Sequence, residues 1–392
     1  MVYNFDELVE RKDTNCEKWD NCRDRFGRND LLPLWVADMD FKTPDFIIDA
    51  LKQRLEHEVL GYQIRPASFY NAVENWLHRR GWQIDPHKIS FSPGVVPAIN
   101  FAVDVFTNPG DRILINTPVY HPFMYAINRH RRTLVKSSLI NSGEGRYTLD
   151  FDDFEKKLAD GVKMYIMCSP HNPVGRVWTL EELTRIGELC LKYNVLVVSD
   201  EIHSDLVFKP HRHTYFASIS EKIARQTVTF IAPSKTFNIA GLSSSIVYSD
   251  NEALHEKFSK FVNSFSISAG TIFGDVALEA AYTHGDNWLS QLLDYLDGNF
   301  EYVVDYLKKY VPRIKTGKPE GTYLMWLDCS ELNMTSSQIQ DFLVSKAGLA
   351  LNPGHIFGEE GEFFVRLNAA TQRAILEKAM DSLRDATEQG FK

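Results

Sequence analysis

The sequence predicts an α/β protein in which a mostly parallel β-sheet is covered by helices on both faces. Five short runs are nearly all apolar, as expected for strands that are buried on both sides. Segments with helical periodicity lie between several of these runs. The 392 residues are 44% hydrophobic, which is enough for a substantial core. The apolar runs span residues 112–115, 164–167, 195–198, 227–231 and 245–248.

The clearest helical segment follows Thr179 and extends to Leu191. Thr179 can cap the helix, and the acidic residues Glu181 and Glu182 suit its first turn. A strand, a helix and a strand at this spacing imply parallel pairing through a crossover helix. The sequence therefore predicts a large layered α/β/α domain over residues 46–285, with ligands at the carboxyl ends of its strands.

The remainder of the chain predicts a smaller α+β domain. A long helix is expected over residues 288–310, followed by strands at 322–327 and 363–367. The apolar N-terminal stretch at residues 32–36 is too short to form a unit alone. We therefore expect residues 1–45 to complete this domain together with residues 286–392.

Composition excludes several classes of function. The 43 basic and 52 acidic residues give a formal charge of -9, so binding to nucleic acid or to an anionic membrane is not expected. No apolar run could span a bilayer, and the N-terminus lacks the pattern of a signal peptide. The five cysteines are scattered, and His211 and His213, expected on a solvated loop, have no close further ligand. We expect a cytoplasmic protein without a metal site.

Four side chains suited to chemistry follow predicted strands of the sheet. Tyr120 follows the strand near residue 113, Asn172 the next, Asp200 the third and Lys235 the fourth. Because the carboxyl ends of parallel strands meet at one edge, this aromatic ring, amide, carboxylate and amine should lie together.

This set matches the needs of pyridoxal 5'-phosphate. The cofactor requires a lysine amine for its aldehyde carbon and a carboxylate that keeps its ring nitrogen protonated, roles that suit Lys235 and Asp200. The opposite charge of the acid raises the pKa of the ring nitrogen. Tyr120 could lie on the ring face, and Asn172 could donate to the ring hydroxyl oxygen.

The cofactor phosphate needs hydrogen-bond donors. Gly94, Val95 and Val96 provide a glycine turn followed by the predicted start of a helix. The free N–H groups and positive dipole of a helix N-terminus suit a dianion. Ser234, beside the lysine, can add a hydroxyl donor.

With these motifs, the chain resembles the fold-type I pyridoxal phosphate enzymes of the class I/II aminotransferase superfamily. More narrowly, it resembles the MalY/PatB-like branch of cystathionine and cysteine-S-conjugate β-lyases. The resemblance covers most of the chain and implies the PLP-dependent transferase-like fold, in which residues 46–285 bind the cofactor. The matching segments lie at residues 33–41, 61–62, 118–123, 169–178, 199–203, 234–242 and 365–368.

The resemblance assigns a role to each matching position. It makes Lys235 the catalytic lysine that holds the cofactor, Asp200 the partner of the ring nitrogen and Tyr120 the stacking ring. Asn172 becomes the donor to the ring hydroxyl oxygen and part of the substrate site. Arg366 becomes the clamp for the substrate α-carboxylate, which agrees with the bidentate geometry of a guanidinium group.

Three further positions follow from the resemblance. Tyr62 is implied to reach the phosphate of a neighbouring subunit, and therefore to mark a homodimer with shared sites. Ser243 stands eight positions after the lysine, where aminotransferases typically have a phosphate-binding arginine. His203 stands near the ring hydroxyl oxygen, where they usually have a tyrosine. Both departures resemble the lyase branch.

The resemblance predicts a β-lyase that cleaves L-cystathionine or related cysteine S-conjugates to a thiol, pyruvate and ammonia. An aminotransferase is the alternative, because the two reactions share their early steps and differ in the fate of one intermediate. A non-catalytic protein that retains the fold is a third hypothesis. The intact set of Lys235, Asp200, Asn172 and Arg366 argues against it. A protein that only binds a partner has no need of a cofactor that accepts electrons from a substrate, or of a clamp for its carboxylate.

Overall fold

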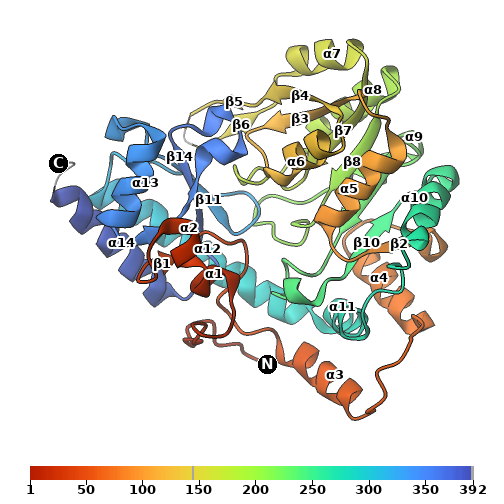
Figure 1. Ribbon diagram of the computed structural model, residues 1–392, viewed down its shortest axis with the longest axis horizontal. Helices are drawn as coiled ribbons and strands as arrows, with labels where there is room; N and C mark the ends of the chain where they lie inside the picture. The colour runs from red at the N-terminus through yellow and green to blue at the C-terminus, as the bar shows by residue number, and fades with distance from the viewer. Residues whose placement is uncertain (144, 390–392) are drawn as a thin grey trace.

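The structure is a computed structural model that describes residues 1–143 and 145–389 (Figure 1). Its largest element is a seven-stranded sheet with helices against both faces. The strand order across the sheet is β2 (Ile89–Ser92), β10 (Ser245–Tyr248), β9 (Thr227–Ile231), β8 (Leu196–Asp200), β7 (Val162–Cys168), β3 (Arg112–Thr117) and β4 (Thr133–Ser138).

Six of the seven strands run in the same direction. β4, β3, β7, β8 and β9 pair in parallel, whereas β10 is antiparallel to both of its neighbours, β9 and β2. Because β10 reverses the direction twice, β2 runs the same way as β9. The carboxyl ends of β2, β3, β7, β8 and β9 therefore meet at one edge, and the predicted α/β fold with a mostly parallel sheet is confirmed.

The direction of β10 could not be derived from its apolar run. The connection from β9 to β10 contains only a short 3-10 helix at Ala240–Leu242 and no crossover helix. A parallel connection requires a dozen or more residues that pass over the sheet, whereas an antiparallel one does not. Residues 232–244 contain no α-helix that could pass over a face of the sheet, so this connection suits an antiparallel strand.

Alternate residues of the strands face two separate cores. On one face, β3 and β7 direct Ile113, Ile115 and Ile166 into a core with three helices. On the other face, Leu114 and Tyr165 lie in a second core. The first face is covered by α5 (Val95–Phe106), α6 (Pro122–Arg129) and α10 (Glu252–Ser264), and the second by α7 (Phe151–Ala159), α8 (Leu180–Lys192) and α9 (Glu221–Ala224).

The predicted cap of α8 is present. Thr179 accepts a hydrogen bond from the Glu182 backbone N–H, and the Glu182 side chain accepts one from the Thr179 N–H. This capping box satisfies two donors that the first turn of a helix cannot satisfy internally.

Both ends of the chain meet in a second group of elements. β11 (Leu324–Asp328), β14 (Phe364–Asn368) and β13 (Asn352–Pro353) form an antiparallel sheet. The N-terminal strand β1 (Leu32–Pro33) pairs in parallel with β12 (Leu349–Ala350). The N-terminal arm, including α1 (Glu17–Asp20) and α2 (Cys22–Phe26), thus lies against C-terminal elements, as Figure 1 shows.

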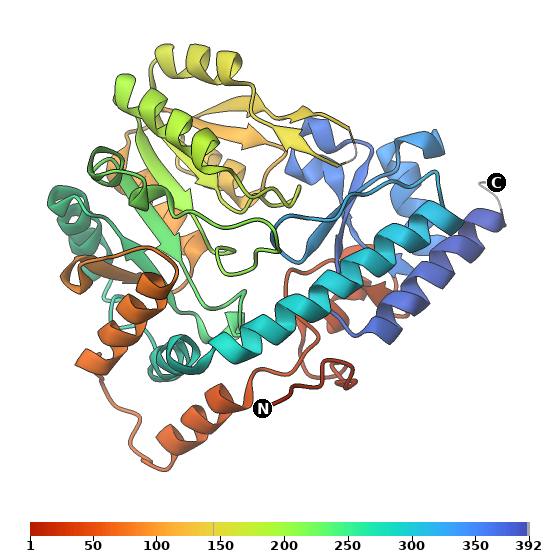
Figure 2. The same ribbon diagram turned by 180° about the vertical axis from the view of Figure 1, so that it is seen from behind.

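A long helix, α12 (Asp286–Tyr310), packs along α14 (Arg373–Glu388) and extends toward α11 (Ile272–His284), as Figure 2 shows. It begins two residues before the predicted start at 288. The remaining helices of eight or more residues are α3 (Asp45–Leu55), α4 (Ala67–Arg79) and α13 (Ser336–Ser345). Across the described ranges, no helix is both long and apolar enough to cross a membrane. The boundaries at 45 and 286 stay a prediction.

Candidate active site

A cavity opens at the edge of the sheet where the parallel strands end. Its lining includes nine residues that the sequence places in the cofactor site, contributed by segments that follow β2, β3, β7, β8 and β9. The nine are Gly94, Val95, Val96, Tyr120, Asn172, Asp200, His203, Ser234 and Lys235.

Lys235 lies four residues beyond the end of β9. Its Nζ donates to the Ala37 carbonyl at 2.6 Å. Burial lowers the pKa of the Lys235 amine to about 8; the Asp38 charge opposes this shift and the Arg366 charge adds to it. A neutral amine is therefore accessible near neutral pH, as a nucleophile or general base requires.

Asp200 is the last residue of β8 and is 4% exposed. Its Oδ1 accepts the Ile202 backbone N–H at 3.1 Å. Burial raises the pKa of the Asp200 carboxyl to about 7, and the charge of Glu201 adds to the effect. An ionised carboxylate is thus costly here unless a cation faces it, as a protonated ring nitrogen would.

Arg366 on β14 meets Asn172, which follows β7. Its Nη1 donates to Asn172 Oδ1 at 3.1 Å, and its Nη2 donates to the Trp35 carbonyl at 3.0 Å. Arg366 is 3% exposed, and its Nε has no hydrogen-bond partner in the described part of the chain. Burial lowers the pKa of this guanidinium to about 10, although the group stays cationic at neutral pH.

No carboxylate is paired with Arg366 among the residues that the structure describes. A buried cation without an anion is costly, so a site of this kind suits an anionic ligand group. The Cζ atom of the guanidinium lies 4.9 Å from the centroid of the Phe357 ring, a distance at which a cation–π interaction adds to its stabilisation. Arg366 does not line the cavity itself but contacts Asn172, which does.

His203 lies three residues after β8 and is 3% exposed. Burial lowers the pKa of its imidazole to about 3, and the nearby charges of Lys235 and Arg366 contribute. The ring is therefore neutral and has one donor and one acceptor nitrogen. Its Nδ1 has no partner within the described residues, so a polar ligand atom could satisfy it.

The start of α5 also lines the cavity. Val95 and Val96 are its first two residues, so their backbone N–H groups have no acceptor within the helix. Ser234, Ser243 and Ser244 line the same cavity. Apart from Lys235, no cationic side chain lines it in the part of the chain described, so an anion here depends on neutral donors.

Tyr62 lies outside this cavity. It is fully exposed, in a stretch where Val59, Leu60 and Ile64 are also largely exposed. The predicted phosphate contact of Tyr62 is therefore not made within one chain.

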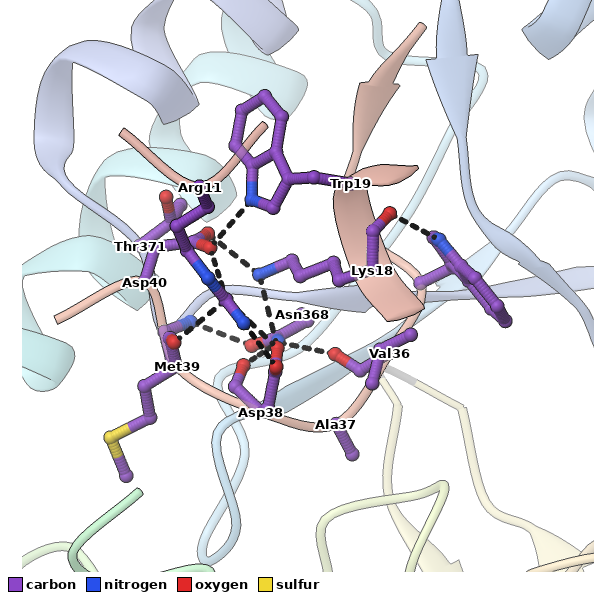
Figure 3. Close-up of polar contacts among 12 residues, drawn as sticks. Arg11, Lys18, Trp19, Val36, Ala37, Asp38, Met39, Asp40, Asn368 and Thr371 are labelled. Carbon is purple, nitrogen blue, oxygen red and sulfur yellow. Dashed lines mark hydrogen bonds and ion pairs between the residues drawn. The ribbon is translucent and has the colours of Figure 1, made fainter. Parts of the chain in front are cut away.

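The loop at residues 35–40 also contacts the site, and its path could not be derived from the sequence. Figure 3 shows this loop together with the charged residues that contact it. The Ala37 carbonyl accepts from both Lys235 and the hydroxyl of Tyr323, the latter at 2.8 Å. The contributing atoms are mainly backbone carbonyls, which every residue type has, so no sequence signal marks them.

One minor expectation was wrong. His213 does not lie on a solvated loop, because its Nε2 is 2.7 Å from Oε2 of Glu201, which is fully buried. The neighbouring imidazole of His211 is exposed. The acidic partner was not recognised because it lies twelve residues earlier, just after β8.

Comparison with known proteins identifies the family. A model of the family described as aminotransferase class I and II matches residues 29–383. The chain belongs to this family. The chain is similar to the cystathionine beta-lyase PatB of Bacillus subtilis (strain 168). The two are 42% identical over 98% of this chain and 99% of PatB. The protein MalY of Escherichia coli (strain K12) is 34% identical over 98% of this chain and 99% of its own.

A solved structure supports the family assignment in three dimensions. Cystalysin from Treponema denticola, whose structure contains a pyridoxal 5'-phosphate cofactor, matches with a TM-score of 0.96 and 38% identity. The match covers 99% of this chain and 100% of cystalysin. The resemblance to this family and its lyase branch is therefore confirmed.

Proposed function

We propose that this protein is a pyridoxal phosphate-dependent carbon–sulfur β-lyase that cleaves L-cystathionine or other cysteine S-conjugates. The observation that carries the proposal is that Lys235 and Asp200 line one cavity, while the buried Arg366, which has no carboxylate partner in the described residues, contacts its lining residue Asn172. Relatives and structural neighbours that are named as cystathionine or C–S lyases support the same activity.

The residues present fit pyridoxal phosphate. Lys235 would hold the aldehyde carbon, and Asp200 would face the ring nitrogen, which supplies the cation that this buried acid lacks. Tyr120 would lie on the ring face, and the unpartnered His203 Nδ1 and the Asn172 amide would face the ring hydroxyl oxygen. When bound, the cofactor withdraws electrons from the substrate Cα.

The phosphate would lie at the start of α5. The N–H groups of Val95 and Val96 and the helix dipole suit a dianion. Gly94 and the Ser234 hydroxyl would complete the binding site.

Side chains of the protein would bind the substrate and transfer its Cα proton. Arg366 would bind the substrate α-carboxylate, and Asn172 would fix the guanidinium beside the cavity. The Lys235 amine, displaced when the substrate amine takes its place, would remove the Cα proton. The thiolate at Cβ then leaves. Hydrolysis of the remaining fragment gives pyruvate and ammonia, so one substrate and one water yield a thiol, pyruvate and ammonia.

We infer that the active unit is a homodimer with shared sites. The exposed Tyr62 and its apolar neighbours Val59, Leu60 and Ile64 favour an interface, because such a stretch is unfavourable in water. Tyr62 of the partner subunit would reach the phosphate and partly replace the missing arginine at Ser243.

We also propose a cytoplasmic location. All five cysteines are free, and four of them are buried, which fits a reducing compartment.

A product assay tests the function. The purified holoenzyme would be incubated with L-cystathionine in the absence of a keto acid, and pyruvate and free thiol would be measured. We expect equal amounts of both products. Activity that requires a keto acid and releases no thiol would identify an aminotransferase instead. The absence of any reaction, together with the absence of a cofactor absorbance band, would support a non-catalytic protein.

A further inference from the structure

A cluster of four charged residues links the start of the chain to the loop at residues 35–40 (Figure 3). Lys18 Nζ lies 2.6 Å from Asp40 Oδ2. Arg11 lies 2.7 Å from a carboxylate oxygen of Asp40 and 2.7 Å from one of Asp38. The indole N–H of Trp19 also donates to Asp40 Oδ1 at 3.0 Å.

The centre of this cluster is removed from water. The Lys18 side chain is 0% exposed and that of Asp40 is 2% exposed, whereas Arg11 and Asp38 lie at the edge. A buried ion pair adds little net stability over a well-packed apolar pair of similar volume, but its geometry is specific. A role in fixing the position of the attached loop therefore explains the cluster better than a role in stability.

The attached loop contacts the two cationic groups of the active site. The Trp35 carbonyl accepts from Arg366 at 3.0 Å, and the Ala37 carbonyl accepts from Lys235 at 2.6 Å. A carbonyl oxygen can move only when the backbone moves. These two hydrogen bonds therefore form only if the loop keeps its present path.

Asn368 holds the same loop from the opposite side. Its Nδ2 donates to the carbonyls of Val36 at 2.7 Å and Asp38 at 2.5 Å. Asn368 lies two residues after Arg366 on β14, so it couples the loop to the strand that carries the guanidinium. These bonds fix the middle of the loop, whereas the charged cluster fixes its end.

We propose that Arg11, Lys18, Asp38 and Asp40 form a positioning cluster that holds the loop at residues 35–40 against Arg366 and Lys235. The cluster thereby sets the orientation of the carboxylate-binding guanidinium and of the amine toward the substrate. This inference rests on the proposed function, because it assigns those two groups to substrate binding and proton transfer.

The cluster should affect the substrate more than the cofactor. Neither Lys18 nor Asp40 lines the cavity, and the start of α5, Ser234 and Asp200 are held by other elements. Displacement of the loop would therefore misplace Arg366 and leave the phosphate site intact. Small misplacements of reacting or binding groups have large effects on rate, up to about 100-fold for 1 Å.

The test compares Lys18→Met, Asp40→Asn and the double variant in the holoenzyme, with L-cystathionine as substrate. We expect KM to rise by about 10-fold or more in each variant, while cofactor affinity stays within about 2-fold of the wild type. The double variant leaves no unpaired buried charge, so its melting temperature should recover toward that of the wild type. Its KM should remain raised, which a purely stabilising role does not predict.

Two further variants keep the test decisive. Arg11→Gln acts at the partly exposed edge of the cluster, so it provides the same readout if Lys18→Met does not fold. Lys88→Met breaks a partly exposed pair with Asp250 before the start of β2, away from the cavity, and should leave KM unchanged.

The outcomes separate the two proposals. If wild-type enzyme releases no thiol from cystathionine, the proposed function fails. If wild-type enzyme is active but KM is unchanged in Lys18→Met and Arg11→Gln, or returns to normal in the double variant, the positioning role is overturned.

Discussion

At the residue scale, burial shifts the pKa of each of the three central groups toward its uncharged form. It lowers the pKa of Lys235 to about 8, raises that of Asp200 to about 7 and lowers that of His203 to about 3. Desolvation disfavours the charged form of each group, so the amine loses its proton more readily and the carboxyl keeps it. These values apply to the protein without its cofactor.

The pKa of Lys235 predicts how cofactor-free protein takes up pyridoxal phosphate. Only the neutral amine attacks an aldehyde, so the rate should increase with pH, by about 10-fold per unit, and level off above about 8. Stopped-flow absorbance between pH 6 and 9 measures this profile. A profile that is flat, or that still rises steeply at pH 9, would show that the amine is not perturbed in this way. Lys235→Ala should show no covalent uptake.

Removal of the Arg366 guanidinium should impair substrate binding selectively. Charge-assisted hydrogen bonds contribute about 1.5–3 kcal/mol each, so Arg366→Ala should raise KM about 100-fold, with little change in cofactor affinity. Arg366→Lys keeps the charge but loses the bidentate geometry and should show a smaller increase. Steady-state kinetics and cofactor titration measure the two effects. If Arg366→Ala lost more affinity for the cofactor than for the substrate, Arg366 would instead be assigned to the cofactor phosphate.

Asp200→Asn tests the proposed partner of the ring nitrogen. The neutral amide cannot hold that nitrogen protonated at neutral pH, so we expect a bound but nearly inactive cofactor. Turnover should fall by at least about 100-fold while the absorbance band of bound cofactor persists. Near-normal turnover would contradict the assignment.

At the scale of the elements, the site depends on strand ends and helix starts. β8 ends at Asp200, and Lys235 follows β9, its parallel neighbour. α5 begins beside them because β2 runs in the same direction. The reversal at β10 is therefore essential to the site, since it brings the phosphate-binding segment to the same edge as the lysine.

The capping box of α8 provides a stability prediction that is separate from catalysis. Thr179→Ala removes the side-chain acceptor for the Glu182 N–H and should lower the free energy of unfolding by about 1 kcal/mol. KM should not change, because neither Thr179 nor any residue of α8 lines the cavity. Urea unfolding and steady-state kinetics measure both. Glu182→Ala should be more destabilising, because it also leaves the buried Arg176 without one carboxylate partner.

At the scale of the whole molecule, the exposed stretch around Tyr62 indicates that one chain is not the complete active unit. Two chains of 45.0 kDa should sediment together as a dimer. Lys235→Ala and Tyr62→Ala subunits, each impaired alone, should regain activity when mixed. One site of the mixed dimer then combines an intact lysine with Tyr62 of the partner subunit. A failure to regain activity in a proven mixed dimer would place Tyr62 outside the shared site.

Much of the site could be predicted from local patterns. Each apolar run that ends in Asp200 or precedes Asn172 and Lys235 is a contiguous signal, and parallel strands bring such ends together. The path of the loop at residues 35–40 could not be predicted, because its contacts with the site are made by backbone carbonyls. Nor could the partners of Asp38 and Asp40, since their charges alone do not indicate whether they face the cavity or the arm.

The sequence by itself determined the fold class, the identity of the reactive groups and the position of each group after a predicted strand. These properties depend on hydrophobic periodicity and on residues adjacent to it, which act over short stretches of chain. Only the tertiary structure decided which distant atoms meet. Lys235 and Ala37 are 198 positions apart, and Arg366 and Asn172 are 194 apart. Such contacts depend on how separate elements pack, and packing is a property of the complete chain rather than of any segment.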